Sequence, residues 1–168
     1  MKTDNSVFVI DADVFIEAKD RYYAFDIAPV FWDTLIAQVS QGRIRSIDRI
    51  KKQLEDGNDE LTNWISRGNL NDAFCSSEQV DVIASYREIM EWVQNNTQFK
   101  SAARAAYAND PDAWLIAFAM AKHNVVVTQE EFVAQVQRRV PIPNVCRQFN
   151  IEYMDTFAML RALGVKFD

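Results

Sequence analysis

The sequence predicts an α/β protein, a three-layer sandwich in which helices flank a mainly parallel central sheet. Strand-like and helix-like segments alternate along the chain, and the connections between them are short. Two apolar runs rich in β-branched residues, at 7–10 and 125–128, are typical of strands that are buried on both faces. Strand–helix–strand units of this kind join parallel strands, so we expect helices on both faces of the sheet.

The first half of the chain supplies two strands and three helical segments. After the strand at 7–10, residues 28–39 have the pattern of a helix that Gly42 ends. Residues 43–47 form a candidate second strand, and Asp48 is placed to cap the helix that follows. The remaining segments are a turn and a renewed helical pattern, at residues 56–59 and 60–64.

The middle of the chain reads as a loop followed by helices. Residues 68–76 are polar enough to be a loop. Ser76 and Gln79 have the spacing of a capping box, for a helix whose apolar stripe runs to about Gln94. The alanine-rich segment 101–108 is also expected to be helical.

The last part of the chain repeats the helix–strand alternation. Asp110 followed by Pro111 predicts a capped start for a strongly apolar helix that ends at Asn124, just before the strand at 125–128. The prolines within 141–144 interrupt the chain. The remaining elements are two helices and a last strand, at residues 145–149, 157–163 and 151–154.

Length and composition fit one domain over residues 1–168 and exclude several classes of protein. The chain is 49% hydrophobic and 12% aromatic, enough for a packed core rather than a disordered chain. No apolar run approaches the ~18 residues that a membrane span needs, and the N-terminus, with Asp4 and a short apolar stretch ending at Asp11, is unlike a signal peptide. We therefore expect a cytoplasmic protein with no membrane partner.

The few cysteines and histidines restrict the chemistry further. Cys75 and Cys146 are the two cysteines and form no CxxC motif, so free buried thiols are expected rather than a zinc site or a disulfide scaffold. One histidine, His123, excludes a nuclease that uses two histidines as acid and base. No GxSxG motif accompanies it, which leaves a Ser-His-Asp triad unsupported. Any catalysis must depend on carboxylates.

The charge distribution is uneven. The net charge of −6 argues against a protein that holds nucleic acid by overall attraction. Basic residues nevertheless concentrate in two places, at Arg43, Arg45, Arg49, Lys51 and Lys52 and at Arg138, Arg139 and Arg147. Such runs are either solvated helix faces or local surfaces that guide phosphates.

Acidic residues follow the two buried strands. Asp11 and Asp13 come after the first strand, Glu130 and Glu131 after the strand at 125–128, and Asp110 and Asp112 begin the helix before that strand. The last two acids could simply cap the helix. Asp11, directly after a buried strand, needs a partner to offset its desolvation. Because ligands bind at the carboxyl ends of parallel strands, we expect these acids to share a Mg²⁺ or Mn²⁺ ion.

A carboxylate metal site is suited to phosphoryl chemistry. A bound divalent ion activates water and stabilises the charge that develops on the phosphate. The sequence has no GxxxxGK[ST] or GxGxxG loop, so nucleotide binding of those kinds is unsupported. Hydrolysis of a phosphodiester is the remaining option.

Two segments, VFVIDADVFIEA and DPDAWLIAFAMAKHNVVVTQEEF, resemble motifs of the PIN domains, in particular of a PIN-like group of small bacterial proteins related to toxin ribonucleases of the VapC type. The segment VFVIDADVFIEA is similar to the family's opening of an apolar strand, an aspartate and an Asn or Asp two residues later. The segment DPDAWLIAFAMAKHNVVVTQEEF is similar to its later helix, strand and Thr-x-Asp/Glu run. The stretches RYYAFDIAPVFWDTL and IPNVCRQFNIEYMDTFAMLRALG resemble the PIN-like group specifically, so the likeness spans nearly the whole chain.

The resemblance implies roles for individual residues. Asp11 matches the first metal-binding aspartate, Asp112 the aspartate of the later helix, and Glu130 the acid two residues after the threonine. Thr128 matches the residue that orients this corner, and Asp13 stands where asparagine is common. We expect catalysis by Asp11, Asp112 and Glu130, with Asp110 as a further candidate metal ligand.

One position departs from the family pattern. The family carries a glutamate on the helix after the second strand, where this chain has Gln53, with Glu55 two residues later. A glutamine offers a carbonyl oxygen but no charge and no base. Two residues rotate a helical side chain by about 200°, so Glu55 is an awkward replacement and is kept only as a candidate ligand.

Three functions are consistent with these residues. The first is a metal-dependent endoribonuclease acting on single-stranded RNA, with Arg43, Arg45, Arg49 or Lys52 holding the backbone; the resemblance adds a toxin role, a cognate antitoxin and a homodimer. The second is a PIN-fold module that binds RNA or protein after losing its metal site at Gln53. The third is a phosphatase of the haloacid dehalogenase class, because the first strand leads into a DxD motif at Asp11 and Asp13.

Overall fold

The computed structural model describes residues 5–67 and 70–167 and has at its centre a 5-stranded sheet in the order β3-β2-β1-β4-β5. Every neighbouring pair of strands is parallel, with Val9 opposite Arg45 on one side and Val126 on the other. The strands are β1 Phe8–Ile10, β2 Ile44–Ile47, β3 Phe74–Cys75, β4 Val125–Val127 and β5 Tyr153–Met154.

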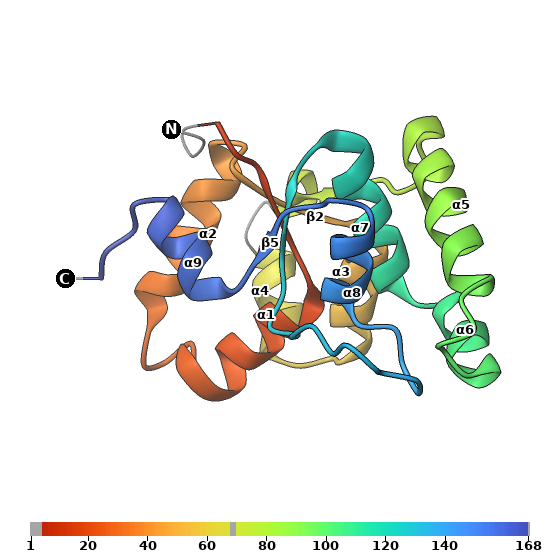
Figure 1. Cartoon of the computed structure of the whole chain (residues 1–168). Coiled ribbons are helices and arrows are strands. Elements are labelled where there is room, and N and C mark those ends of the chain that lie inside the picture. The colour runs from red at the N-terminus through yellow and green to blue at the C-terminus, as the bar shows by residue number, and fades with distance from the viewer. Residues whose placement is uncertain (1–4, 68–69, 168) are drawn as a thin grey trace.

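Helices cover both faces of this sheet. Figure 1 shows α2 and α9 on one side, and α7 with α5 beyond it on the other. The helices are α1 Ala12–Glu17, α2 Pro29–Ser40, α3 Asp48–Asp56, α4 Glu60–Arg67, α5 Val80–Gln94, α6 Ser101–Tyr107, α7 Pro111–Lys122, α8 Ile142–Gln148 and α9 Thr156–Ala162, with a π-helical turn η1 at Ala18–Tyr22 and a 3-10 turn η2 at Leu70–Ala73. The predicted three-layer α/β sandwich is therefore confirmed.

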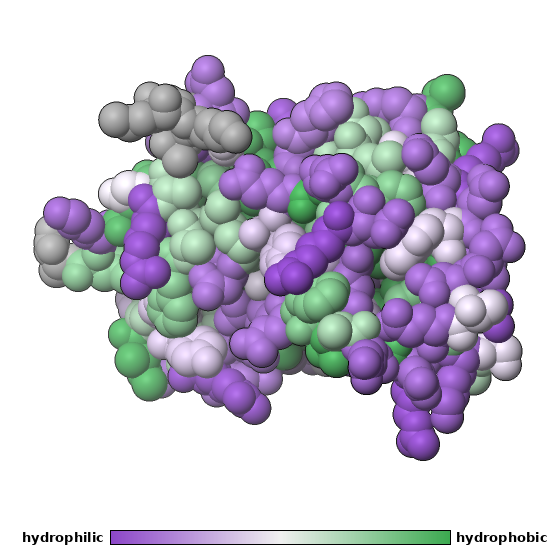
Figure 2. Space-filling view, in the orientation of Figure 1, coloured by the Kyte–Doolittle hydropathy of each residue, from purple (hydrophilic) through white to green (hydrophobic). Residues whose placement is uncertain are grey.

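The core forms around the two apolar strands identified from the sequence. All residues of β1 and β4 are buried, and they join Trp32, Ile47 and Phe118 in one hydrophobic cluster. Hydrophilic residues cover most of the side of α5 and α6, while apolar residues gather towards α2 and α9 (Figure 2). None of the described helices is long and apolar enough to span a membrane.

Two expected caps are wrong. Asp48 is the first residue of α3 rather than its cap, and its Oδ1 accepts hydrogen bonds from the backbone of Arg49 and from the backbone and hydroxyl of Ser77. Helix α5 begins after Gln79, and Ser76 accepts instead from Glu78 N at 3.1 Å. In both places a hydrogen bond between neighbouring segments or within a turn replaces the local cap.

The segment boundaries differ in three further places. Residues 70–75 of the expected loop form η2 and the edge strand β3, which pairs with β2, whereas 68 and 69 lie outside the described residues. Helix α8 begins at Ile142, with proline in its first turn, three residues before the expected start. Helix α1 and turn η1, which follow Asp11 directly, were not predicted from the sequence.

Candidate active site at the carboxyl edge of the sheet

The order in which the strands are added to the sheet reverses between β1 and β4. Strands β2 and β3 follow β1 on one side of the sheet, and β4 and β5 lie on its other side. In parallel α/β sheets this reversal opens a binding site at the carboxyl ends of the strands. Asp11 and Thr128, the residues directly after β1 and β4, lie at this point, and Asp11 N donates to Val127 O at 3.0 Å.

Asp11 is the most buried acid at this edge, with 2% of its surface exposed. It takes the N-cap position of α1, yet its carboxylate makes no capping hydrogen bond. The hydroxyl of Thr128 lies 3.4 Å from Asp11 Oδ2 and accepts from Glu130 N at 3.1 Å. Thr128 thus connects the aspartate after β1 to the acidic loop after β4.

The two aspartates at the start of α7 have different positions. Asp110 caps the helix, since its Oδ1 accepts from Asp112 N at 2.9 Å. The Asp112 carboxyl group takes no part in this cap and lies within hydrogen-bonding range of Asp11. The capping alternative therefore holds for Asp110 and not for Asp112.

Burial and mutual repulsion make both carboxyl groups weak acids. Burial raises the pKa of Asp11 well above its ordinary value, and the charges of Asp112, Asp13 and Glu130 raise it further. Burial, followed by repulsion from Asp110 and Glu130, raises the pKa of Asp112 to about 7. Among the described residues, no lysine or arginine forms an ion pair with either group. The pair needs a proton or a cation between its oxygens.

Glu130 lies at the same edge, but its carboxylate is already engaged. Its Oε1 accepts from Arg139 Nη1 at 2.7 Å and its Oε2 from Ile142 N at 3.1 Å. As these side chains stand, the described part of the chain has no group of three His, Cys, Asp or Glu residues able to hold a metal ion. The structure brings Asp11 and Asp112 together and leaves Glu130 beside them, turned towards Arg139.

The remaining acids surround this pair. Asp13 is exposed on the first turn of α1, and partial burial, with repulsion from Glu17 and Asp110, raises its pKa. Oxygen ligands of this kind suit Mg²⁺ or Mn²⁺, so the buried pair fits a hard divalent ion. The pair would take a third ligand if Glu130 turned away from Arg139.

Gln53 and Glu55 are both exposed on α3, because Ile50 and Leu54 turn to the core. Gln53 lies one turn after Arg49, on the face of α3 that meets Trp114 of α7. Glu55 is not among the charged residues that most raise the pKa of Asp11 or of Asp112.

The basic residues expected to hold RNA lie at different places, before and within β2 and along α3. Arg43 precedes β2, at the opposite end of the strands, and donates to Ser6 O; Arg45 lies within β2. Arg49 lies over the Trp114 ring at 4.2 Å and donates to Ser77, while Lys52 is exposed.

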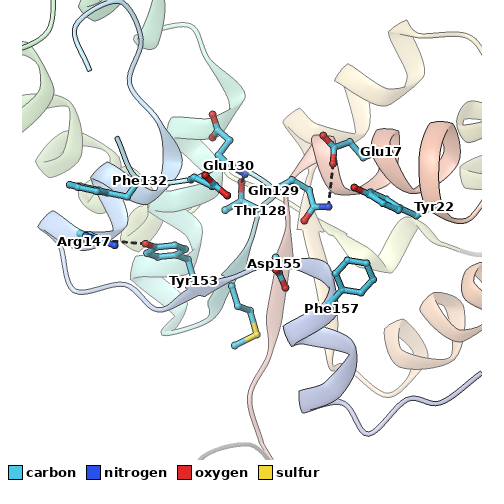
Figure 3. Close-up of a pocket in the computed structure, with 12 residues that line it drawn as sticks. Glu17, Tyr22, Thr128, Gln129, Glu130, Phe132, Arg147, Tyr153, Asp155 and Phe157 are labelled. Carbon is cyan, nitrogen blue, oxygen red and sulfur yellow. Dashed lines mark hydrogen bonds between the residues drawn. The ribbon is translucent and has the colours of Figure 1, made fainter. Parts of the chain in front are cut away.

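Two arginines that the sequence placed only in a general basic concentration lie at or beside the site. Arg139, with 55% of its side chain exposed, contacts Glu130, and Arg147 lines a neighbouring pocket of about 550 Å³. Their signal was the second concentration of basic residues, at Arg138, Arg139 and Arg147. Figure 3 shows the pocket beside Thr128 and Glu130, with Gln129 at its centre.

Comparisons with known proteins agree with this architecture. A family model described as "Domain of unknown function (DUF4411)" matches residues 8–167. A chain in the crystal structure of VapBC2 from Rickettsia felis bound to a DNA fragment from their promoter is similar at a TM-score of 0.51 and 10% identity, over 89% of this chain and 98% of that chain. The search of curated proteins found no match. At this identity the structural likeness concerns the fold alone, and it agrees with the expected PIN-like sheet.

Proposed function

Because the chain belongs to the DUF4411 family and its buried acids meet at the carboxyl edge of a PIN-like sheet, we propose that it is a metal-dependent endoribonuclease of the PIN type. Its substrate is single-stranded RNA, whose phosphodiester bonds it hydrolyses. The observation that carries the proposal is the pair formed by Asp11 and Asp112, two carboxyl groups with raised pKa and no basic partner among the described residues.

Asp11 and Asp112 would hold the Mg²⁺ or Mn²⁺ ion, with Glu130 as the third ligand and Asp110 and Asp13 close by. A divalent ion bound there would supply an activated water and neutralise charge on the attacked phosphate. Thr128 positions Asp11 and the backbone of Glu130 through its hydroxyl. The exposed guanidinium of Arg139 is placed to exchange Glu130 for a phosphate oxygen, since arginine binds both kinds of anion.

RNA cleavage by the purified protein tests this assignment. We expect cleavage of single-stranded RNA with Mg²⁺ or Mn²⁺ and none with a chelator. Asp11→Asn should lower the rate by about 100-fold or more, the usual cost of removing a group that stabilises transition-state charge. The matched control is Asp33→Asn on the exposed face of α2. Equal rates for the two variants would refute the proposal.

A second function is favoured by a specific observation, the ion pair between Glu130 and Arg139. A PIN-fold module without catalysis would show such an ion pair, and it would also show Gln53 in place of the glutamate of the PIN domains. Titration with Mn²⁺ in a calorimeter separates the two functions. Saturable binding that Asp11→Asn abolishes supports the nuclease, whereas no binding supports the non-catalytic module.

A partner follows from the same proposal. If the chain is a toxin of VapC type, a cognate antitoxin protein would cover this edge of the sheet, and the toxin would act in the cytoplasm as a homodimer. Induced expression of the chain alone should then arrest bacterial growth, and expression of Asp11→Asn should not. Equal growth in both cultures would argue against a toxin role.

A further inference from the structure

The pocket next to the acids gathers the exposed aromatic side chains of the molecule. In the described part of the chain, four aromatic residues are exposed: Tyr22, Phe132, Phe157 and Phe167. The first three line the pocket of about 550 Å³, together with the half-buried Tyr153. We call this site the aromatic pocket. Exposed rings that converge on one cavity indicate a ligand with a planar surface.

One wall of the aromatic pocket is a fixed stack. The guanidinium of Arg147 lies over the Phe132 ring, 3.9 Å from its centroid, and Arg147 Nε donates to the Tyr153 hydroxyl at 3.1 Å. The backbone next to Phe132 is held by the buried Asn144, which accepts from Val133 N and donates to Val133 O. This wall is therefore formed before any ligand arrives.

The opposite wall comes from distant segments. Tyr22 of η1 and Phe157 of α9 meet edge to face, with ring centroids 5.9 Å apart. Between the walls, Gln129 donates to Glu17 at 3.2 Å and accepts from the Thr156 hydroxyl at 3.3 Å. Figure 3 shows Phe132, Arg147 and Tyr153 on one side of Gln129, and Tyr22 and Phe157 on the other. The space between the walls ends in fixed polar groups.

We propose that the aromatic pocket binds one unpaired nucleobase of the RNA, adjacent to the phosphodiester bond that is cleaved. The inference rests on the proposed function, because it assumes that an RNA strand lies at the acidic edge and places one of its bases in the pocket. Single-stranded RNA is recognised by stacking its bases on aromatic rings and on the planes of arginine side chains. Glu130 belongs both to the acidic edge and to the pocket lining, so the two sites are continuous.

A nucleobase suits the pocket better than the arginine of a protein partner. At the Phe132 wall a second guanidinium would meet the like charge of Arg147. The carboxylates that also line the pocket can accept hydrogen bonds from the amino groups of a base as well as from a guanidinium; they are those of Glu17, Glu130, Glu131 and Asp155. A neutral base can extend the stack, and its amino and carbonyl groups can pair with the polar groups between the walls. The same geometry excludes a duplex, in which the bases are stacked on one another.

Fluorescence of a short single-stranded RNA that carries one 2-aminopurine tests the proposal. Asp11→Asn provides the background, since the proposed function makes this variant inactive. We expect binding to this variant to quench the fluorescence, because the base stacks on the aromatic wall. Adding Phe132→Ala or Phe157→Ala should weaken the binding about tenfold, the loss expected for one base–aromatic stack.

The controls separate recognition from folding and from catalysis. Phe167→Ala removes a ring that is 43% exposed, close to the 42% of Phe157, but lies outside the pocket. Arg147→Lys keeps the charge and loses the planar stack, so it should weaken binding as Phe132→Ala does. Circular dichroism should be the same for all variants.

Several outcomes would overturn the inference. Equal affinity of the Phe132→Ala and Phe167→Ala variants would do so, as would binding of an arginine-containing peptide that competes with the RNA for Phe132. If the wild type cleaves RNA but Phe132→Ala leaves KM and the cleaved positions unchanged, the base-binding proposal is refuted and the nuclease proposal is retained. If no RNA is cleaved but RNA binding depends on Phe132, the nuclease proposal is refuted and the binding of a base in the pocket is retained.

Discussion

Asp11 and Asp112, to which the proposed function assigns the chemistry, are also residues that weaken the fold. Asp11 is buried to 98% of its surface, since only 2% is exposed, and its neighbours are acids rather than bases. Burying a charge without a partner is costly, so the group holds a proton far above its ordinary pKa. A residue selected for stability alone would not be a carboxylate here. Such destabilised positions are typical of functional sites.

The raised pKa of Asp112 predicts how stability depends on pH. In the folded chain this pKa is about 7, against an ordinary value of 3.8. Between these values the folded state holds a proton that the unfolded state has lost, so stability falls as the pH rises from about 4 to about 7. Asp112→Asn removes this penalty. We expect the variant to gain about 1 to 2 kcal/mol at pH 8, or roughly 2 to 8 °C in Tm.

Thermal melting in a metal chelator measures this effect. The gain of Asp112→Asn over the wild type should shrink towards pH 4, where the wild-type carboxyl group is also neutral. Asp33→Asn, at an exposed site on α2, should show no gain at either pH. A gain that is the same at pH 4 and pH 8 would contradict the assigned pKa.

At the scale of elements, the start of α7 gives two neighbouring aspartates different positions. Asp110 satisfies the helix and Pro111 starts it, which leaves Asp112 to face Asp11. At α5 the same kind of local signal, Ser76 with Gln79, did not form a capping box. Caps are weak enough for a competing turn or a contact with another element to displace them.

The cap of α7 can be tested by two substitutions of one residue. Asp110→Asn keeps an acceptor for Asp112 N, whereas Asp110→Ala removes it. Both remove the charge that repels Asp112, so the difference between them reports the cap alone. We expect the alanine variant to be about 1 kcal/mol less stable than the asparagine variant in urea unfolding. No difference would mean that the cap adds nothing to the helix.

At the scale of the whole molecule, the strand order determines where the acids meet. Because β1 lies between β2 and β4, the ends of β1 and β4 adjoin each other at the reversal point of the sheet. Asp11, Asp112 and Thr128 come from three segments and converge there, although 117 residues separate Asp11 from Thr128. Because the strands are parallel, Arg43, which precedes β2, lies at the opposite end of the strands from these acids.

Local pattern alone determined much of this protein. The two buried strands, the capped start of α7 and the acids that follow each strand were readable because apolar runs, caps and turns depend on residues close in the chain. Only the tertiary structure decided which partner each side chain has. Glu130 pairs with Arg139 nine residues later, η1 places Tyr22 against Phe157 of α9, and Gln53 stays at the surface. These partners depend on how distant segments pack. The balance between the cost of desolvation and the gain from pairing is set by that packing, so it cannot be read from the spacing of neighbouring residues.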